Sequence, residues 1–188
     1  MSRGGTVVPT EGRVSDQCEG KMRAIRLLLL DVDGVMTDGK IIFDDDRKQT
    51  KAFDVKDGHG IKMLMRAGID VALVTARESR VVEHRARELG IDLVFQKVTR
   101  KVEALQEIIR VKGVAEEEIA YVGDDLIDLP ILRRVGLSVA VADGVDEVRQ
   151  SVDYVTEKRG GNGAVREVCD LILKVQGKWD AVTERYFV

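Results

Sequence analysis

Two carboxylates separated by one residue follow a short apolar segment near the start of the chain. Residues 27–30 are leucines, and they lead directly into Asp31, Val32 and Asp33. Acidic side chains are seldom buried at the end of a strand without a partner, and crowded carboxylates repel each other unless a cation relieves the repulsion. A hard cation such as Mg²⁺ binds oxygen ligands of this kind. The spacing therefore predicts a magnesium site after this segment.

A second acidic cluster ends another apolar segment in the same way. Residues 119–122 lead into Gly123, Asp124 and Asp125, and Asp128 follows closely. Repetition of the pattern indicates two strand ends that contribute acids to one site.

Hydroxyl and basic side chains complete the set of groups that could do chemistry. Thr75 and Arg77 close a third apolar segment, and Lys101 opens the helix expected after a fourth. Each of these residues taken singly is typical of an ordinary surface or strand end. We expect them to converge with the acids on one edge of the molecule.

The elements that must position these groups are predicted by the pattern of apolar residues. Five short segments read as strands, and they cover residues 27–32, 71–75, 93–95, 119–122 and 137–141. They are nearly continuous in apolar residues, as strands covered by helices on both faces require, and amphipathic segments separate them. This alternation predicts an α/β fold with a Rossmann-like, doubly wound parallel sheet. In such a sheet ligands bind at the carboxyl ends of the strands, where all these groups fall.

Helical spacing of apolar residues fills the intervals between the strands. We expect helices over residues 78–89, 99–111, 126–132 and 164–175. Gly90 and Gly113 follow the first two as stop signals, and Pro130 suits the first turn of the third.

One segment, residues 39–55, does not follow this alternation of strands and helices. Residues 40–43 and 50–55 read as two strands around an acidic turn, so we expect a β-hairpin over residues 39–55, inserted after the first strand. The turn aspartates could bind calcium, but the glycine of a calcium-binding EF-hand loop is missing and Asp is a common turn former. The turn interpretation is favoured.

Composition bounds the remaining possibilities. The chain has 188 residues, of which 44% are hydrophobic, and this suits a single domain over residues 21–177. Its 30 basic and 33 acidic residues nearly cancel, which argues against a nucleic-acid partner. The polar extension 1–20, expected to be partly disordered, lacks the apolar core of a signal peptide, and no segment is long enough to span a membrane. Cys18 and Cys169 have no metal-site spacing, so a cytoplasmic protein with reduced thiols is expected.

The motifs resemble those of the haloacid dehalogenase superfamily of phosphatases. Its signature consists of DxDx(T/V), a Ser or Thr, a Lys and GDxxxD. The chain supplies these in order as residues 31–35, Thr75, Lys101 and residues 123–128. Each motif alone is weakly specific, whereas four in order at predicted strand ends and helix starts are strongly so.

This resemblance implies roles for the acids. Asp31 attacks phosphorus and forms an aspartyl-phosphate, and Asp33 acts first as general acid and then as general base. Mg²⁺ is held by the Asp31 carboxylate, the Asp33 backbone carbonyl and Asp124. Asp125 and Asp128 support the site.

It also implies roles for the other polar groups. Thr75 and Lys101 bind the remaining phosphoryl oxygens, and Asp128 orients Lys101 or a water on the metal.

Longer segments resemble the 3-deoxy-D-manno-octulosonate 8-phosphate phosphatase family. They cover residues 31–39, 51–61, 120–129, 135–143 and 160–173. The resemblance implies a subunit without a large cap domain and a homotetramer in which hairpins associate and a neighbouring subunit helps to close the active site. The implied substrate is an eight-carbon sugar acid phosphate of lipopolysaccharide precursor biosynthesis.

The carboxylate of such a substrate requires a cation outside the phosphate site. Arg77 and Lys62 are the predicted binding residues, and three further candidates are Lys158, Arg159 and Arg166. The chain has His59 where the family commonly has tyrosine, and Ala76 where it has glycine. Both positions lie near the expected substrate pocket.

Two segments near the C-terminus have two interpretations each. Gly160, Gly161 and Gly163 could form a loop that closes over substrate or a simple connection. The tail 178–188 could be disordered or could insert into a neighbouring subunit.

Three alternatives to this function remain open. A phosphatase for a nine-carbon, sialic-acid-like sugar phosphate would share every catalytic residue and differ around Lys56, Lys62 and Arg77. A non-catalytic tetramerisation module is disfavoured by the intact acids and Lys101. A phosphotransferase or phosphoserine-type enzyme fits the short insertion poorly.

Overall fold

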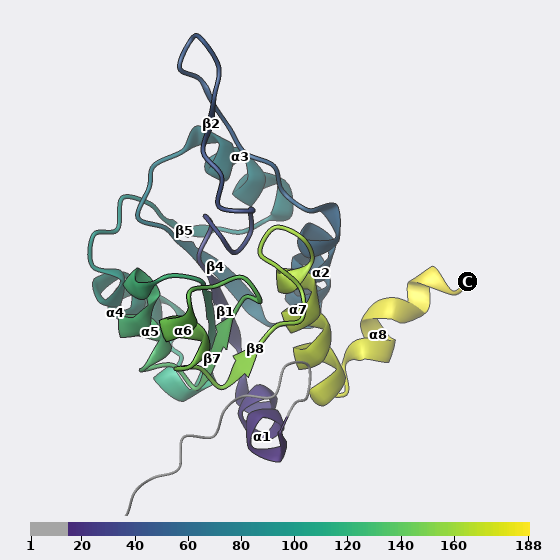
Figure 1. The fold of residues 1–188 in the computed structure, drawn as a ribbon. Helices are drawn as coiled ribbons and strands as arrows, with labels where there is room; N and C mark the ends of the chain where they lie inside the picture. The colour runs from purple at the N-terminus through teal and green to yellow at the C-terminus, as the bar shows by residue number, and fades with distance from the viewer. Residues whose placement is uncertain (1–14) are drawn as a thin grey trace, which may run out of the picture.

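A single parallel sheet forms the centre of the computed structural model, which describes residues 15–188 (Figure 1). The strand order is β5-β4-β1-β6-β7-β8, and every neighbouring pair is parallel. The strands are β1 (Leu27–Leu30), β4 (Asp70–Val74), β5 (Leu93–Phe95), β6 (Ile119–Gly123), β7 (Leu137–Ala140) and β8 (Tyr154–Val155). The predicted α/β fold is confirmed, and β8 is an additional strand of two residues.

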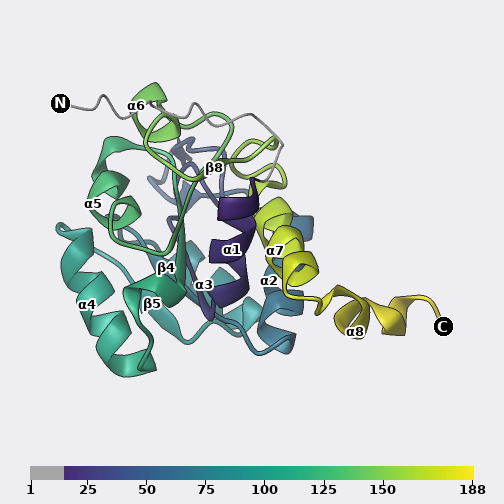
Figure 2. The ribbon, with the colours of Figure 1, turned by 90° about the horizontal axis from the view of Figure 1, so that it is seen from below.

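Helices cover both faces of the sheet (Figure 2). Leu28 and Leu30 of β1 face one hydrophobic cluster, and Leu27 and Leu29 face the other. The first cluster includes side chains of α1 (Asp16–Ala24), α2 (Val55–Arg66), α3 (Arg80–Leu89), α7 (Ala164–Val175) and α8 (Trp179–Thr183). The second includes α4 (Lys101–Lys112), α5 (Leu129–Leu132) and α6 (Asp146–Arg149). Burial on both faces explains why the strand residues are apolar without alternation.

Three of the four predicted helices, those over residues 78–89, 99–111 and 164–175, agree with the structure within two residues. α3 and α4 end before Gly90 and Gly113, and Pro130 lies in the first turn of α5. A short 3₁₀ helix, η2 (Leu126–Asp128), precedes α5, and another, η1 (Glu116–Glu118), precedes β6. The apolar residues from 126 to 132 therefore belong to two short turns rather than to one helix.

The hairpin consists of β2 (Ile42–Phe43) and β3 (Gln49–Thr50), which pair antiparallel and project from the sheet (Figure 1). The prediction of a second strand as far as residue 55 is wrong. Asp54 accepts hydrogen bonds from the backbone N–H groups of Lys56 and Asp57 and so starts α2 at Val55. Between β1 and α2 the described chain holds only this hairpin, and no large cap domain.

Both ends of the described chain form helices, where the sequence predicted an extension and a tail. Residues 1–14 of the predicted extension lie outside the described residues, and the boundary at residue 20 is wrong because it falls within α1. The predicted tail forms α8 and a 3₁₀ turn, η3 (Glu184–Tyr186), so disorder is wrong for these residues. Arg66 of α2 donates to Tyr186 Oη at 3.1 Å, and the rings of His59 and Tyr186 lie 5.3 Å apart. No helix in the described part of the chain is long and apolar enough to cross a membrane.

Candidate active site

The carboxyl ends of three adjacent strands meet at one pocket. Leu30 of β1 pairs with Leu73 of β4 and with Val122 of β6, so the residues that follow these strands lie side by side. The pocket has a volume of about 210 Å³, and its lining residues are Asp31, Asp33, Gly39, Thr75, Ala76, Arg77, Asp124, Asp125 and Ile127. Six predicted site residues are therefore together, and Lys101 and Asp128 contact them from the protein side.

Asp31 lies just beyond β1 and is almost completely buried. One carboxylate oxygen accepts the Val32 N–H at 2.7 Å, and the other lies 3.0 Å from Lys101 Nζ. Burial raises the pKa of Asp31 to about 6, Lys101 opposes this rise, and the charge of Asp128 adds to it. The adjacent Lys101 ammonium favours the ionised carboxylate, which is the form that a nucleophile must have.

Lys101 is the centre of a buried polar network at the start of α4. Its ammonium lies 2.6 Å from Asp128 Oδ1 and donates to Tyr121 Oη at 3.1 Å. Burial alone would lower the pKa of Lys101, but the Asp31 and Asp128 carboxylates outweigh this effect and raise it. Lys101 therefore remains a cation beside the predicted nucleophile.

Both oxygens of Asp128 are already used by the protein. Oδ1 accepts from Lys101 and from Tyr121 Oη, the latter at 2.5 Å. Oδ2 accepts the backbone N–H groups of Asp124 at 3.0 Å and Asp125 at 3.2 Å. Asp128 thus fixes both Lys101 and the turn after β6. Tyr121 was not predicted as a site residue, because its only signal in the sequence is a phenol in an otherwise aliphatic buried strand.

Oxygen atoms of Asp31, Asp124 and Asp128 lie within 4.8 Å of one another, which suits a metal ion. The Oδ1 atom of Asp124 is buried without a hydrogen-bond partner. Burial, and then the charges of Asp128 and Asp31, raise the pKa of Asp124 to about 8. A divalent cation would relieve this repulsion and provide the missing partner, so the residues fit Mg²⁺. Because Asp128 is saturated, Asp31 and Asp124 are the carboxylates free to bind it.

The Asp33 side chain points to a different set of groups. Its Oδ1 contacts Lys51 Nζ, and its Oδ2 lies 3.9 Å from Arg77 Nε. The Asp33 carboxylate is not part of the acidic cluster, so only its backbone carbonyl remains as the predicted metal ligand. Lys51 was not predicted as a site residue, although it begins the segment 51–61 that resembles the phosphatase family.

Thr75 and Arg77 are on the wall of the pocket opposite the acids of β6. Thr75 is buried after β4, and its Oγ1 accepts the Arg77 backbone N–H at 3.3 Å. The Arg77 side chain is 43% exposed at the rim. A buried hydroxyl and a rim guanidinium suit a phosphoryl oxygen and a more distant anionic group, respectively.

The other predicted substrate-binding cations lie elsewhere in the subunit. Lys62 is exposed on α2 and does not line the pocket, because helical spacing turns its neighbours Ile61 and Met63 inward instead. The pocket of a single subunit therefore does not include Lys62, and its role in substrate binding stays a prediction. Arg166 pairs with Asp170 at 2.7 Å and lines a separate hollow with Lys158.

The glycine-rich loop 160–163 packs directly against the segment that carries Asp33. Gly161 donates its N–H to Val35 O at 2.9 Å, and Gly160 donates to Asp143 Oδ1 at 2.9 Å. A Cβ atom on Gly160 would lie 1.7 Å from Gly34 O, so no side chain fits there. The loop therefore packs against the backbone that follows Asp33 and is not among the segments that line the pocket.

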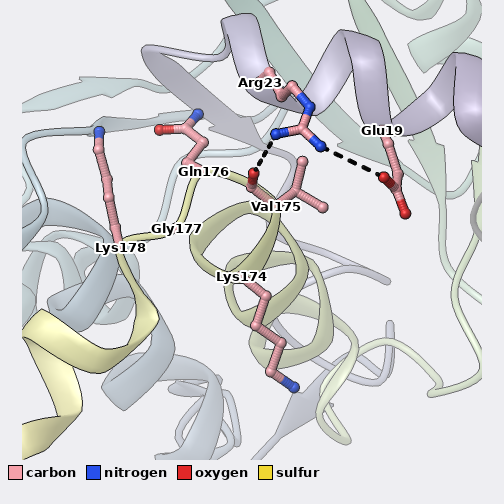
Figure 3. A pocket seen from close by; sticks show the side chains of 7 residues that line it. All are labelled: Glu19, Arg23, Lys174, Val175, Gln176, Gly177 and Lys178. Carbon is pink, nitrogen blue, oxygen red and sulfur yellow. Dashed lines mark hydrogen bonds and ion pairs between the residues drawn. The ribbon is translucent and has the colours of Figure 1, made fainter.

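A larger hollow, of about 900 Å³, lies between α1 and the end of α7 (Figure 3). Its carboxylate, Glu19, lies 3.7 Å from Arg23, which also donates to Val175 O at 3.2 Å. The seven lining residues provide no acidic cluster and lie away from the carboxyl ends of the strands. Chemistry therefore favours the smaller pocket as the active site.

Comparisons with known proteins agree with this geometry. A model of haloacid dehalogenase-like hydrolases matches residues 91–168. The 3-deoxy-D-manno-octulosonate 8-phosphate phosphatase of Escherichia coli (strain B / BL21-DE3) is 46% identical over 181 residues, which cover 96% of each chain. A Yersinia pestis crystal structure of a phosphatase of that name has a TM-score of 0.88 at 46% identity and covers 89% of this chain and 90% of its own. The Moraxella catarrhalis phosphatase, in complex with magnesium, phosphate and KDO, has a TM-score of 0.89 at 42% identity and covers 91% and 98%.

Proposed function

Because the chain belongs to the 3-deoxy-D-manno-octulosonate 8-phosphate phosphatase family of haloacid dehalogenase-like hydrolases, we propose that it hydrolyses this sugar phosphate to the free sugar acid and phosphate. The supporting observation is the pocket in which Asp31, Asp33 and Asp124 gather at adjacent strand ends. The same proposal includes a role in lipopolysaccharide precursor biosynthesis.

In the first step a carboxylate oxygen of Asp31 attacks phosphorus. The bond between phosphorus and the sugar oxygen breaks, its electron pair stays on that oxygen, and the Asp33 carboxyl group donates the proton that completes the alcohol. Lys101 and Thr75 bind the phosphoryl oxygens, where much of the transition-state charge lies.

In the second step the Asp33 carboxylate accepts a proton from water as the water oxygen attacks phosphorus. The acyl-phosphate bond breaks with its electron pair returning to Asp31, and inorganic phosphate leaves. Asp33 is then protonated again, so the cycle balances. Asp31, Asp124 and the Asp33 carbonyl would hold Mg²⁺, which when bound offsets negative charge on the phosphoryl group.

Arg77 is the cation proposed for the substrate carboxylate. It lies at the pocket rim and is 43% exposed, so its guanidinium is available to an anion. Arg77→Ala should raise KM for the sugar acid phosphate more than for 4-nitrophenyl phosphate, which has no carboxylate. Equal changes for both substrates would contradict this role.

The active assembly is proposed to be a homotetramer in which neighbouring subunits complete the site. Ile41, Ile42 and Phe43 of the hairpin are 48%, 49% and 58% exposed, and a two-stranded ribbon is marginally stable alone. Light scattering at micromolar concentration should give a tetramer mass for the wild type. Phe43→Asp should give smaller species, and Asp45→Asn at the hairpin turn should not. A monomeric wild type would overturn the proposal.

A cytoplasmic location is proposed with this function. Cys18 and Cys169 are both buried and free of disulfides, which is typical of proteins in a reducing compartment.

Phosphate release from a panel of sugar phosphates with Mg²⁺ tests the substrate. We expect the highest kcat/KM with the eight-carbon sugar acid phosphate. A higher value with a nine-carbon sugar acid phosphate would favour the alternative phosphatase. Failure to release phosphate from any small ester would favour the non-catalytic module.

A further inference from the structure

Lys51 is a buried cation at the edge of the active site. It follows β3 directly and lies in the short connection to α2, which Asp54 caps. Its side chain is 1% exposed, and its ammonium contacts Asp33 Oδ1. A buried ammonium is unfavourable unless it is paired, so the position of Lys51 depends on the Asp33 carboxylate.

The two members of this pair differ in their access to the pocket. The Asp33 side chain is 22% exposed and lines the pocket, whereas Lys51 is enclosed and does not line it. Lys51 therefore approaches the carboxylate from the protein side. Its ammonium contacts Oδ1 of Asp33. The other oxygen, Oδ2, lies on the side of the pocket rim, 3.9 Å from Arg77 Nε.

A carboxylate held at one oxygen presents the other in a defined direction. Proton transfer requires a short, aligned contact between the carboxyl group and the reacting oxygen. Rotation of the Asp33 side chain away from this orientation would leave the Lys51 ammonium buried without its acceptor. The buried pair thus opposes the rotation that would misalign the acid.

We propose that Lys51 is a positioning residue that orients the Asp33 carboxyl group for its two proton transfers. The proposal rests on the proposed phosphatase function, in which Asp33 is the general acid and base. Lys51 acts through Asp33 and does not touch the substrate. It also links the hairpin connection to the reacting groups, because it lies between β3 and α2.

The proposal predicts that loss of Lys51 slows the first step by different amounts for two classes of phosphate ester. A sugar alcohol is a poor leaving group and needs the Asp33 proton when its bond to phosphorus breaks. The 4-nitrophenolate ion is a good leaving group and needs little protonation. Loss of Lys51 should slow aspartyl-phosphate formation from the sugar ester and spare its formation from the nitrophenyl ester. Hydrolysis of the intermediate needs Asp33 as base and should slow in both cases.

Lys51→Met, Lys51→Arg and the exposed control Lys48→Met are compared with the wild type by rapid mixing in Mg²⁺. We expect Lys51→Met to lower the first-turnover rate with the sugar phosphate by about 10²-fold. Its first-turnover rate with 4-nitrophenyl phosphate should change by less than about threefold, followed by a slow steady state and accumulation of the aspartyl-phosphate. Lys51→Arg should recover part of the loss, and Lys48→Met should match the wild type.

Equal losses for the two esters in the first turnover, or none, would overturn the proposal. Circular dichroism checks that each variant folds. If Lys51→Met does not fold, Lys51→Arg provides the test. An unchanged ratio of its first-turnover rates with the sugar phosphate and with 4-nitrophenyl phosphate would then contradict the proposal. A wild type that releases no phosphate from any ester overturns the proposed function and this inference together. A wild type that is active while the ratio in the variants stays unchanged overturns the role of Lys51 alone.

Discussion

Two buried lysines approach the reacting aspartates, and they are held in different ways. Lys101 contacts Asp31, Asp128 and Tyr121 inside the fold, with both carboxylates almost inaccessible to water. Lys51 contacts Asp33, whose side chain is 22% exposed, and it belongs to the connection after the hairpin. The Lys101 region therefore combines chemistry with fold stability, whereas a change in the Lys51 region can alter the chemistry with less effect on the fold.

Substitution of the proposed nucleophile should have the largest effect and should separate the roles of Asp31 and Asp33. Asp31→Asn keeps the size of the side chain but replaces the carboxylate by a neutral amide, which is a far weaker nucleophile, so we expect turnover with Mg²⁺ to fall by about 10⁴-fold or more. Asp33→Asn should instead retain the first release of nitrophenolate. Phosphate release and rapid mixing measure the two effects, with Asp45→Asn as control. Turnover above a trace in Asp31→Asn would refute the nucleophile assignment.

Lys101→Met should affect both activity and stability. It leaves Asp31 and Asp128 buried without their cation, and removal of one partner from a buried pair costs about 3–5 kcal/mol in the free energy of unfolding. Lys51→Met should cost less, because water reaches Asp33 from the pocket. Urea denaturation of both variants measures the difference. Equal costs would show that the two regions are held alike.

Asp57 provides a pH-dependent test on the side of α2. Burial raises its pKa from 3.8 to about 6, although it accepts the Arg166 backbone N–H at 2.8 Å at the start of α7. The folded state therefore holds this proton more tightly than the unfolded state. The stabilisation that comes from protonation of Asp57 is fully present below about pH 4 and is lost as the pH rises through about 6.

Asp57→Asn keeps an oxygen acceptor for α7 and removes the titration. The variant should gain free energy of unfolding relative to the wild type as the pH rises from about 4 to 7. Denaturation at several pH values measures this difference, and subtraction removes the contributions of other acids. A difference that does not depend on pH would contradict the assignment.

Tyr121→Phe should have the smallest effect. It removes a hydroxyl that contacts Lys101 and Asp128 but leaves their ion pair in place. We expect a loss of about 1 kcal/mol in the free energy of unfolding and an activity within about tenfold of the wild type. Thermal denaturation and phosphate release measure these changes. A loss as large as that of Lys101→Met would mean that the hydroxyl, rather than the ion pair, holds the network together.

Sequence patterns predicted those parts of the molecule whose residues act locally. Apolar runs marked five strands, glycines marked the ends of α3 and α4, and the acids after β1 and β6 marked the site. β8 was missed because a strand of two residues has no detectable period, and α1 because it buries only Cys18 and Met22.

The residues that sequence patterns did not reveal have partners that are distant in the chain. Lys51 and Tyr121 owe their roles to contacts with Asp33 and Asp128, which no local spacing encodes. Lys62 was assigned by charge alone, and charge does not say which face of a helix a residue occupies. Residue type predicts the chemistry of a site better than it predicts which cations reach it.

The close contact between Gly160 and Gly34 O has a consequence for mutational data. A methyl group at position 160 would already lie 1.7 Å from that carbonyl oxygen, so even alanine would push the segment after Asp31 out of place. A saturation scan scored by growth or phosphate release should therefore rank position 160 beside Asp31. The two positions would be indistinguishable in such a scan. Asp31 contributes a nucleophile, whereas Gly160 contributes only the absence of a side chain, which leaves space for the backbone of Gly34.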